Sequence, residues 1–294
     1  MDCQKFLGRS LAVAELVEEA TCVARSDARI LISGERGTGK TLLARVIHQR
    51  SGRNQRPVVP IACSLPEALL ESELFGPAVG ADARDEAHGL LALANGGTVV
   101  LDEAGEMSPR IQRLLLRFFD GGDVRGDASL DRCSVPPARI VSTSSCDLYD
   151  RTVRKEFSEE LFYRLNVVHL VIPALRERRE DVPILWDHFV NAVSTQHQLA
   201  PPEITTDGMG ALQTYDWPGN VRELKTVAER IVMRHSGRAV AAAHVSAQLA
   251  APRPEPSVSP TATPQLRLGA TAVDHIMPGR PTLWSGLRGR ASRR

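Results

Sequence analysis

Hydrophobic and polar positions in the first two thirds of the chain follow two alternating patterns. Short apolar runs, of the kind that buried strands need, lie at residues 28–33, 57–63, 97–103 and 138–145. Between them, apolar residues recur every three or four positions, which predicts amphipathic helices at residues 10–26, 41–50, 65–75 and 108–119. Regular alternation of strands and helices is typical of an α/β fold with a doubly wound parallel sheet. Ligands of such sheets bind at the carboxyl ends of the strands.

This alternation stops after about residue 173. Helical periodicity continues without strand signals at residues 180–197, 205–215 and 220–236. From residue 251 onward Pro, Ser, Thr and Ala dominate and no periodicity remains, which indicates disorder. The pattern therefore predicts an α/β subdomain, a small all-helical subdomain and a disordered tail, at residues 6–172, 173–250 and 251–294.

Composition adds limits on the class of protein. A hydrophobic content of 43% and a charged content of 24% are typical of a soluble globular protein. The net charge of +1 favours neither a nucleic-acid nor a membrane partner, although the tail is basic. No apolar run approaches the roughly 18 residues of a membrane helix, and the N-terminus has no signal-peptide core. Five scattered cysteines without a C-x-x-C pair fit reduced thiols, so we expect a cytoplasmic protein without membrane attachment.

The sequence GERGTGKT at residues 34–41 matches a phosphate-binding loop, and it stands between a predicted strand and a predicted helix. Glycines let the backbone curl so that its N–H groups face phosphate. Lys40 is expected to reach the outer phosphates and Thr41 to hold Mg²⁺. The predicted nucleotide-binding residues are Gly34, Gly37, Thr38, Gly39, Lys40 and Thr41.

A second motif, GGTVVLDE, ends in two carboxylates at residues 102 and 103. Its apolar strand should deliver Asp102 and Glu103 to the sheet edge beside the phosphate-binding loop. Asp102 suits a role in holding Mg²⁺, directly or through water. Glu103 is then the candidate base that polarises an attacking water. The alternative interpretation is a pair of acids on a solvated strand end.

Several further stretches carry a family resemblance: ESELFG, GGTVVLDEAGEM, FSEELFYRLNVV, PALRERREDVPIL and WPGNVREL. Together with GERGTGKT they resemble the AAA+ ATPase domain of bacterial enhancer-binding proteins, the sigma-54-dependent transcription activators of the NtrC class. The resemblance runs from about residue 6 to 250. It implies an AAA+ P-loop NTPase fold with a helical lid, and ATP with Mg²⁺ as ligands. It also implies assembly into a ring, normally a hexamer, and sigma-54 RNA polymerase as a partner.

The resemblance assigns roles to two arginines. Arg164 matches a finger arginine that reaches the γ-phosphate held by a neighbouring subunit. A guanidinium suits this role because it neutralises charge that develops on the phosphoryl group. Arg222 matches the lid arginine that senses the nucleotide. The plainer alternatives are surface ion pairs, of Arg164 with Glu160 and of Arg222 with an acid on its own helix.

Other positions depart from the family pattern. Ser145 stands where the family has a sensor asparagine, and Ser158 stands where it has a second finger arginine. The family asparagine that restrains the catalytic glutamate is replaced by Ile61 or Ala62, and neither side chain can hydrogen-bond Glu103. Finger arginines contribute roughly 10³–10⁵ to turnover in related NTPases. We therefore expect ATP binding with reduced hydrolysis.

The stretch GPAVGADARDEAHG, at residues 76–89, matches the loop that contacts sigma-54 in the family, whose signature is GAFTGA. The six aligned residues are Gly80, Ala81, Asp82, Ala83, Arg84 and Asp85. Only the first two agree, so we expect the usual contact with sigma-54 to fail.

Family members usually also carry an N-terminal regulatory domain and a C-terminal helix-turn-helix, and the sequence shows a pattern for neither. Sequence-specific DNA binding is therefore not expected. The leading hypothesis is an ATP-binding regulator of transcription with weak ATPase activity. The alternative is a nucleotide-dependent interaction module that modulates related regulators without remodelling polymerase.

Overall fold

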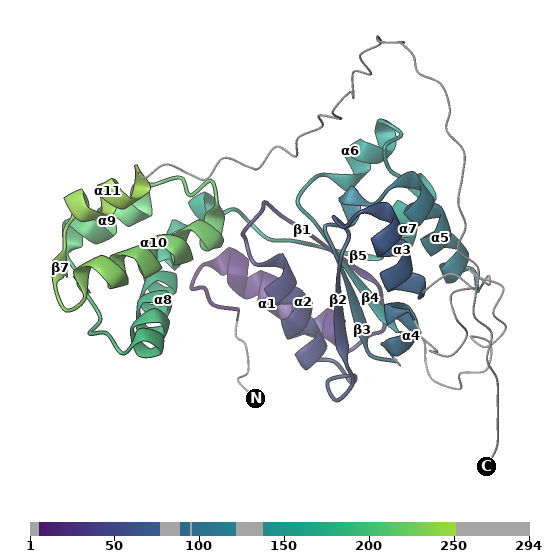
Figure 1. Cartoon of the computed structure of the whole chain (residues 1–294), viewed down its shortest axis with the longest axis horizontal. Helices are drawn as coiled ribbons and strands as arrows, with labels where there is room; N and C mark the ends of the chain where they lie inside the picture. Colours follow the sequence, from purple (N-terminus) through teal and green to yellow (C-terminus); the bar gives the residue numbers. More distant parts are fainter. Residues whose placement is uncertain (1–5, 77–88, 95, 122–137, 251–294) are drawn as a thin grey trace, which may run out of the picture. The chain divides into compact units, whose positions relative to one another are not determined.

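The computed structural model describes residues 6–76, 89–94, 96–121 and 138–250. Apolar runs form one five-stranded sheet, in the order β2-β3-β4-β1-β5, and every neighbouring pair of strands is parallel (Figure 1). The strands are β1 (Ile30–Ser33), β2 (Val58–Ala62), β3 (Thr98–Asp102), β4 (Arg139–Ser144) and β5 (Val168–Val171). The predicted doubly wound parallel fold is confirmed. The fifth strand was not predicted from the sequence, although residues 167–172 form an apolar run that is interrupted only by His169.

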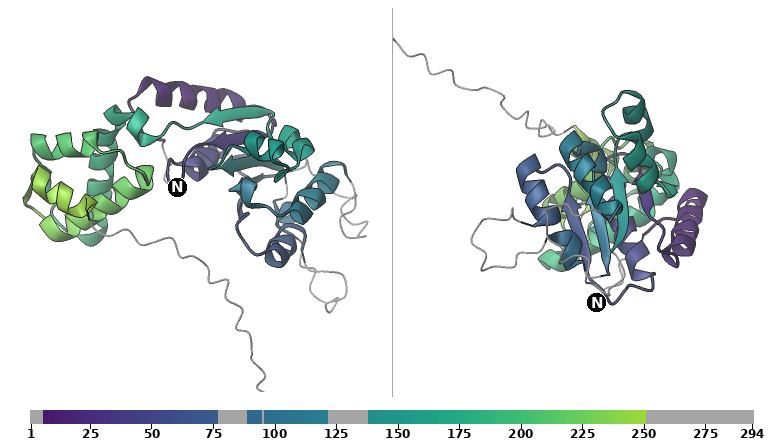
Figure 2. Two further views of the ribbon diagram at one scale, coloured as in Figure 1. Left: turned by 90° about the horizontal axis from the view of Figure 1, so that it is seen from above. Right: turned by 90° about the vertical axis from the view of Figure 1, so that its right-hand side faces the viewer.

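Helices cover both faces of the sheet (Figure 2). One face packs against α1 (Leu11–Ala24) and α2 (Lys40–Gln49). The other packs against α3 (Glu67–Phe75), α4 (Leu90–Leu93), α5 (Pro109–Phe119) and α7 (Glu159–Leu165). Because strand side chains alternate between faces, Ile30 and Ile32 join the first core and Leu31 joins the second.

Short polar residues fix where several helices begin. The hydroxyl of Ser10 accepts a hydrogen bond from the N–H of Val13 at the start of α1. Ser108 and Ser158 cap α5 and α7 in the same way, and Asp147 caps α6 (Leu148–Val153). Such caps satisfy backbone donors that have no partner within the helix. The local sequence therefore sets these helix starts independently of the sheet.

The second part of the fold is mainly helical. It consists of two short 3-10 helices, η3 (Leu175–Glu177) and η4 (Arg179–Asp181), followed by α8 (Val182–His197), α9 (Thr206–Thr214), α10 (Asn220–His235) and α11 (Ala242–Leu249). Its core contains Trp186 and Trp217, both almost fully buried. Two short strands, β6 (Glu203–Ile204) and β7 (Ala239–Val240), pair in parallel within it. The predicted helical lid thus also contains a minimal β-ladder.

Two predictions concern residues outside the described ranges. The predicted sigma-54 contact loop lies mostly in residues 77–88, and the predicted tail begins at residue 251. In the part of the chain that the structure describes, no helix is long and apolar enough to cross a membrane.

Candidate nucleotide site

The loop GERGTGKT joins β1 to α2, and two of its glycines are required by its shape. Gly37 and Gly39 have φ angles of +85° and +110°, in the left-handed region that favours glycine. A Cβ atom on Gly37 would lie 2.3 Å from the carbonyl oxygen of Gly219, and one on Gly39 would lie 3.1 Å from the ring of Phe6. The backbone can therefore curl tightly and leave its N–H groups facing the start of α2, where the helix dipole favours an anion.

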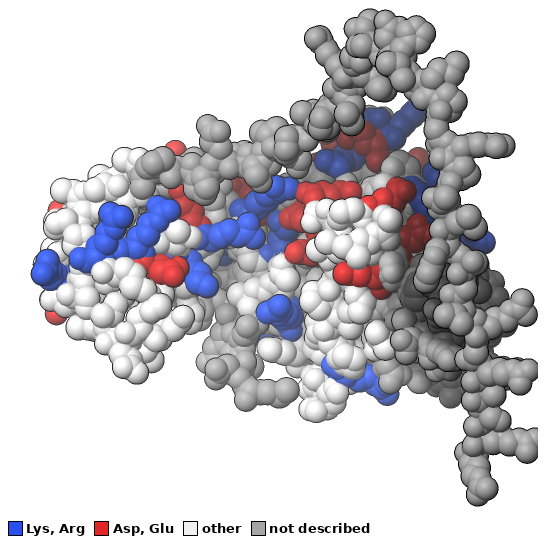
Figure 3. Space-filling view, in the orientation of Figure 1, with Lys and Arg blue, Asp and Glu red and all other residues white. Residues whose placement is uncertain are grey.

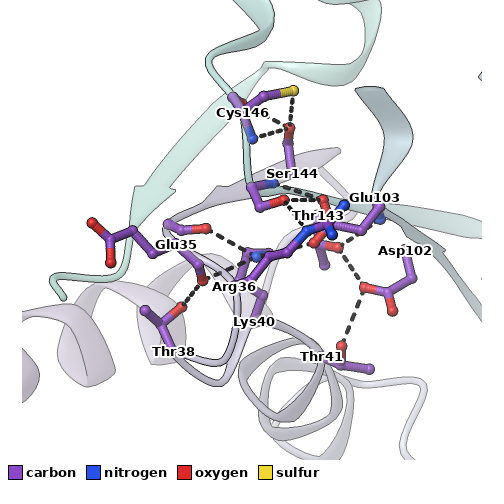
Figure 4. Close-up of polar contacts among 12 residues, drawn as sticks. Glu35, Arg36, Thr38, Lys40, Thr41, Asp102, Glu103, Thr143, Ser144 and Cys146 are labelled. Carbon is purple, nitrogen blue, oxygen red and sulfur yellow. Dashed lines mark hydrogen bonds and ion pairs between the residues drawn. The ribbon is translucent and has the colours of Figure 1, made fainter. Parts of the chain in front are cut away.

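Lys40 stands at the centre of this loop, with its side chain only 5% exposed. Its Nζ donates to the carbonyl oxygens of Gly34, at 2.9 Å, and Glu35, at 3.2 Å. It also lies 3.2 Å from Oε1 of Glu103 (Figure 4). Thr38 is buried and donates its hydroxyl to the carbonyl of Glu35. The ammonium group is thus held between the loop carbonyls and the carboxylate of Glu103.

Asp102, the last residue of β3, is surrounded by hydroxyl groups. Its Oδ1 accepts from Oγ1 of Thr41, at 3.2 Å, and from Oγ1 of Thr143 on β4, at 2.6 Å. No three His, Cys, Asp or Glu side chains come together as a metal site among the described residues. Mg²⁺ in nucleotide sites is normally held by one or two side-chain oxygens together with phosphates and water. The adjacent oxygens of Thr41 and Asp102 fit that requirement.

Glu103 follows β3 in a left-handed backbone conformation, with φ of +57°. A non-glycine residue there costs roughly 1–2 kcal/mol, so the surrounding contacts must hold it. Its N–H donates to Oγ1 of Thr143, and its Oε2 accepts from both the N–H and the hydroxyl of Ser145. Burial raises the pKa of Glu103, but the hydrogen bonds from Ser145 and the attraction of Lys40 outweigh it, so the net pKa is lowered. Glu103 is therefore held ionised at the sheet edge.

The lid supplies the remaining wall of a cavity of about 610 Å³. The turn at residues 217–219 precedes α10, and the N–H of Arg222 donates to the carbonyl oxygen of Gly37 at 3.3 Å. Figure 3 shows Lys and Arg side chains gathered over the part of the lid where Figure 1 draws α10. The charged residues that line the cavity are Arg36, Lys40, Asp102, Glu103, Glu106, Arg222 and Lys225. Basic side chains thus approach the phosphate position from both the loop and the lid.

A second set of lid contacts holds the outer side of the loop. Arg176 binds both carboxylate oxygens of Glu35, at 2.6 and 2.9 Å, and Nδ2 of the buried Asn220 donates to the same carboxylate at 3.0 Å. The hydrogen bond from Arg176, followed by that from Asn220, lowers the pKa of Glu35 to about 2. Arg178, also buried, donates to the carbonyl oxygen of Thr38. Sequence reasoning missed these residues, although the family stretches that contain them were visible.

Arg164 lies apart from this cavity, on α7. Its guanidinium is 2.5 Å from Oδ1 of Asp120 and 3.7 Å from Oε1 of Glu160. It is not among the residues that line the cavity of its own chain. Ser158, at the second finger position of the family pattern, caps α7 through its hydroxyl. The structure thus brings Lys40, Thr41, Asp102, Glu103 and Arg222 together and leaves Arg164 elsewhere.

The site residues fall within two regions that match known families. Residues 6–171 match the family model of the sigma-54 interaction domain. Residues 176–261 match the AAA+ ATPase lid domain. The chain belongs to the sigma-54 interaction domain family. The AAA+ resemblance seen in the sequence is therefore confirmed.

Relatives of this sigma-54 interaction domain include the transcriptional regulatory proteins ZraR of Salmonella typhimurium and GlrR of Escherichia coli. The chain is 41% identical to ZraR over 251 residues and 43% identical to GlrR over 249 residues. Each alignment covers 84% of this chain and 56% of the relative. The chain thus spans a little over half the length of these relatives.

Solved structures of NtrX from Brucella abortus share the fold. The complex with ADP aligns with a TM-score of 0.75 and 33% identity, over 84% of this chain and 56% of NtrX. The complex with ATP aligns with a TM-score of 0.73 and 32% identity, over 82% of this chain and 57% of NtrX.

Proposed function

We propose that this chain is an ATP-binding, Mg²⁺-dependent AAA+ regulator of transcription with weak ATPase activity. The observation that carries the proposal is the convergence of Lys40, Thr41, Asp102 and Glu103 in one cavity, closed from the lid by Arg222. The complexes of NtrX with ADP and with ATP support the choice of nucleotide. The relatives named above are regulators of transcription, which supports the same role here.

The residues of the cavity would have separate roles in ATP binding and hydrolysis. The loop N–H groups and Lys40 would bind the phosphates, and Arg222 would add positive charge from the lid. Thr41 and Asp102 would hold Mg²⁺, which supplies charge neutralisation at the phosphates when it is bound. The Glu103 carboxylate would accept a hydrogen bond from the attacking water and orient it.

Slow turnover follows from the groups outside the cavity. Ser158 is a neutral helix cap at the position where the family resemblance implies a finger arginine. Arg164, the remaining finger candidate, pairs with Asp120 of its own chain and must leave that contact to reach a neighbour's nucleotide. Loss of a finger arginine lowers turnover roughly 10³–10⁵-fold in related NTPases. The proposal is therefore retained binding with reduced hydrolysis.

Two measurements test this function together. ATP affinity is measured by fluorescence titration with Mg²⁺, and hydrolysis by steady-state phosphate release, with the matching domain of ZraR as the reference. We expect comparable affinity and a rate at least about tenfold lower. Lys40→Ala is the control that should remove binding and hydrolysis. A rate equal to that of the ZraR domain would refute the weak-ATPase part, and absence of ATP binding would refute the whole proposal.

Ring formation is the expected assembly, because Arg164 has no role within its own cavity. Large apolar side chains are exposed on α6, on α7 and on or beside β5, near Arg164 in the fold: Tyr149, Val153, Tyr163, Val167 and Val171. Exposed apolar patches of this kind favour protein contacts. Light scattering with and without ATP should show a ring, expected to be a hexamer, that Tyr163→Lys dissociates. Monomers at all concentrations with ATP would refute ring formation.

Contact with sigma-54 is proposed to be lost, on the sequence of residues 80–85. Replacing Gly80–Asp85 by the family signature GAFTGA should create binding to sigma-54 that the unaltered chain lacks. A pull-down with purified sigma-54 and ATP measures this, and replacement of the same six residues by a scrambled signature is the control. Strong binding by the unaltered chain would contradict the proposal.

The second candidate function, an interaction module for related regulators, is favoured by one observation. Ser158 provides no guanidinium, so this subunit would complete a neighbour's site with fewer charges than an intact relative. Mixed with a full-length relative such as ZraR, the chain should lower the ATPase rate per relative subunit. The Lys40→Ala variant of this chain is the control: it should not lower the relative's ATPase rate if the effect needs nucleotide bound to this chain. An unchanged rate at several-fold excess of this chain would exclude the module function.

A further inference from the structure

The two oxygens of the Glu103 carboxylate are bound by groups of different origin. Oε1 lies 3.2 Å from Nζ of Lys40, in the phosphate-binding loop. Oε2 accepts two hydrogen bonds from Ser145, one from the N–H at 2.8 Å and one from the hydroxyl at 2.7 Å. Charge-assisted hydrogen bonds of this length are among the stronger ones in proteins. The side chain is therefore fixed at both oxygens.

Ser145 reaches Glu103 because of the sheet order. β3 and β4 are neighbours in parallel register, with Leu101 opposite Ser142. The residues that follow the two strands therefore emerge at the same edge. The hydroxyl of Ser145 also accepts a long hydrogen bond, 3.4 Å, from Nε of Arg36 in the phosphate-binding loop. Arg36 itself pairs with Glu106, so Ser145 stands between the loop and the carboxylate.

The two contacts of Glu103 respond differently to a bound phosphate. Lys40 must turn toward the phosphates, because its ammonium group is the loop's cation for that anion. Ser145 lies after β4, and its single hydroxyl proton is committed to Oε2. Arrival of nucleotide would therefore free Oε1 while Oε2 stays bound. One free oxygen, on a carboxylate of fixed orientation, is what a water-orienting group needs.

We propose that Ser145 is a positioning residue, which anchors Oε2 of Glu103 so that Oε1 alone is released toward the attacking water when nucleotide engages Lys40. This inference rests on the proposed ATP hydrolysis. It gives Ser145 a role that Ile61 and Ala62 cannot fill, since neither carries a donor in its side chain. Ser145 then acts on the base, and direct binding of phosphate is not its function.

The test compares single-turnover ATP hydrolysis, with protein in excess, for three variants of the full chain. Ser145→Ala should lower the rate constant about tenfold, because one hydrogen bond to a charged group is lost while the backbone N–H remains. Ser145→Thr keeps the hydroxyl and should restore most of the rate. Ser142→Ala, on the strand β4 that leads to Ser145, is the matched control, since the Ser142 hydroxyl has no hydrogen-bond partner within the described residues. Its rate should equal that of the wild type.

Affinity for ATP provides a readout apart from catalysis. A fluorescent ATP analogue should bind Ser145→Ala within about twofold of the wild type, because Ser145 acts on Glu103 and makes no phosphate contact. A tenfold loss of affinity would overturn the proposal and assign Ser145 to phosphate binding. In a Glu103→Gln background, Ser145→Ala should lower the rate by less than about twofold, since the charged acceptor is gone.

The remaining outcomes are also decisive. Equal rates for wild type and Ser145→Ala overturn this inference and leave the proposed function intact. A faster Ser145→Ala enzyme also overturns it, because Ser145 would then be a restraint on Glu103. A wild type that binds ATP and shows no hydrolysis overturns the inference together with the ATPase part of the proposed function. Absence of ATP binding removes the basis of both.

Discussion

Two sides of the phosphate-binding loop are held in different ways. On the sheet side, the ends of β3 and β4 present side chains to the cavity: Asp102, Glu103, Thr143 and Ser145. On the lid side, the contacts reach the loop's backbone carbonyls and the outward-facing Glu35: Arg176, Arg178, Asn220 and Arg222. The sheet side therefore carries the candidate catalytic groups. The lid side connects the helical subdomain to the phosphate-binding loop.

The two sides also differ in rigidity. Thr143 is fully buried, and β3 and β4 are joined along their length. The lid side mixes the fully buried Asn220 with the solvent-exposed pair of Arg176 and Glu35, whose side chains are 39% and 43% exposed. Exposed pairs are screened by water and salt. Nucleotide chemistry is therefore expected to depend on the sheet side, and one part of the lid's hold on the loop is expected to weaken with salt.

The largest expected effect comes from Glu103→Gln on the sheet side. The amide keeps the shape of the side chain but cannot act as a base, so kcat should fall at least about 10²-fold. ATP affinity should change by less than about threefold, because Lys40 and the other phosphate-binding groups of the loop are all retained. Phosphate release and fluorescence titration measure the two quantities. A large loss of affinity with unchanged kcat would reverse the assignment of chemistry to the sheet side.

The next effect is on stability, through Asn220 on the lid side. Its side chain accepts from the N–H of Leu175 and donates to Glu35 and to the carbonyl of Arg36, and its φ is +51°. Asn220→Ala leaves buried groups without partners and should lower the free energy of unfolding by about 2–3 kcal/mol. Chemical denaturation measures this. Asn220→Gly relieves the backbone and should recover part of the loss, and a neutral Asn220→Ala would show that these bonds are unimportant.

A smaller effect is expected for Arg176→Ala, which removes the exposed bidentate pair with Glu35. ATP affinity should fall about threefold at low salt, because the loop is less ordered before binding, and the difference should shrink at high salt. Arg179→Ala is the matched control, since Arg179 forms a similar exposed pair with Asp216, away from the loop. Equal effects of the two variants would argue against a specific link through Glu35.

The smallest effect concerns the pH dependence of stability. The hydrogen bond from Arg176, followed by that from Asn220, lowers the pKa of Glu35 to about 2 from its ordinary value of 4.5. Because the folded pKa is the lower one, Glu35 stabilises the fold above about pH 5 and loses that contribution as the pH falls toward 2. The difference in unfolding free energy between wild type and Glu35→Gln should therefore narrow over this range. Denaturation at several pH values measures it, and a difference independent of pH would contradict the ion pair.

Much of the fold could be predicted because local patterns carry it. Periodicity located four of the five strands in the main sheet and the long helices, and GERGTGKT with GGTVVLDE located Lys40 and Glu103. β5 was missed because the polar His169 interrupts the apolar run at residues 167–172. Three points stay predictions. They are the subdomain boundary at residue 173, the roles of the individual site residues and the loss of sigma-54 contact by the loop that includes residues 77–88.

The sequence by itself determined the class of fold, the phosphate-binding loop and the family, since these depend on local spacing and motif order. Only the tertiary structure decided which residues hold Glu103 and Glu35. Ser145 is 42 positions from Glu103, and Asn220 is 185 positions from Glu35. Such contacts arise from strand order and from the lid's packing on the loop. Because Ile61 or Ala62 replaces the family asparagine, the sequence predicted that Glu103 would lack a hydrogen-bond donor. In the structure Ser145, which follows the neighbouring strand β4, supplies that donor.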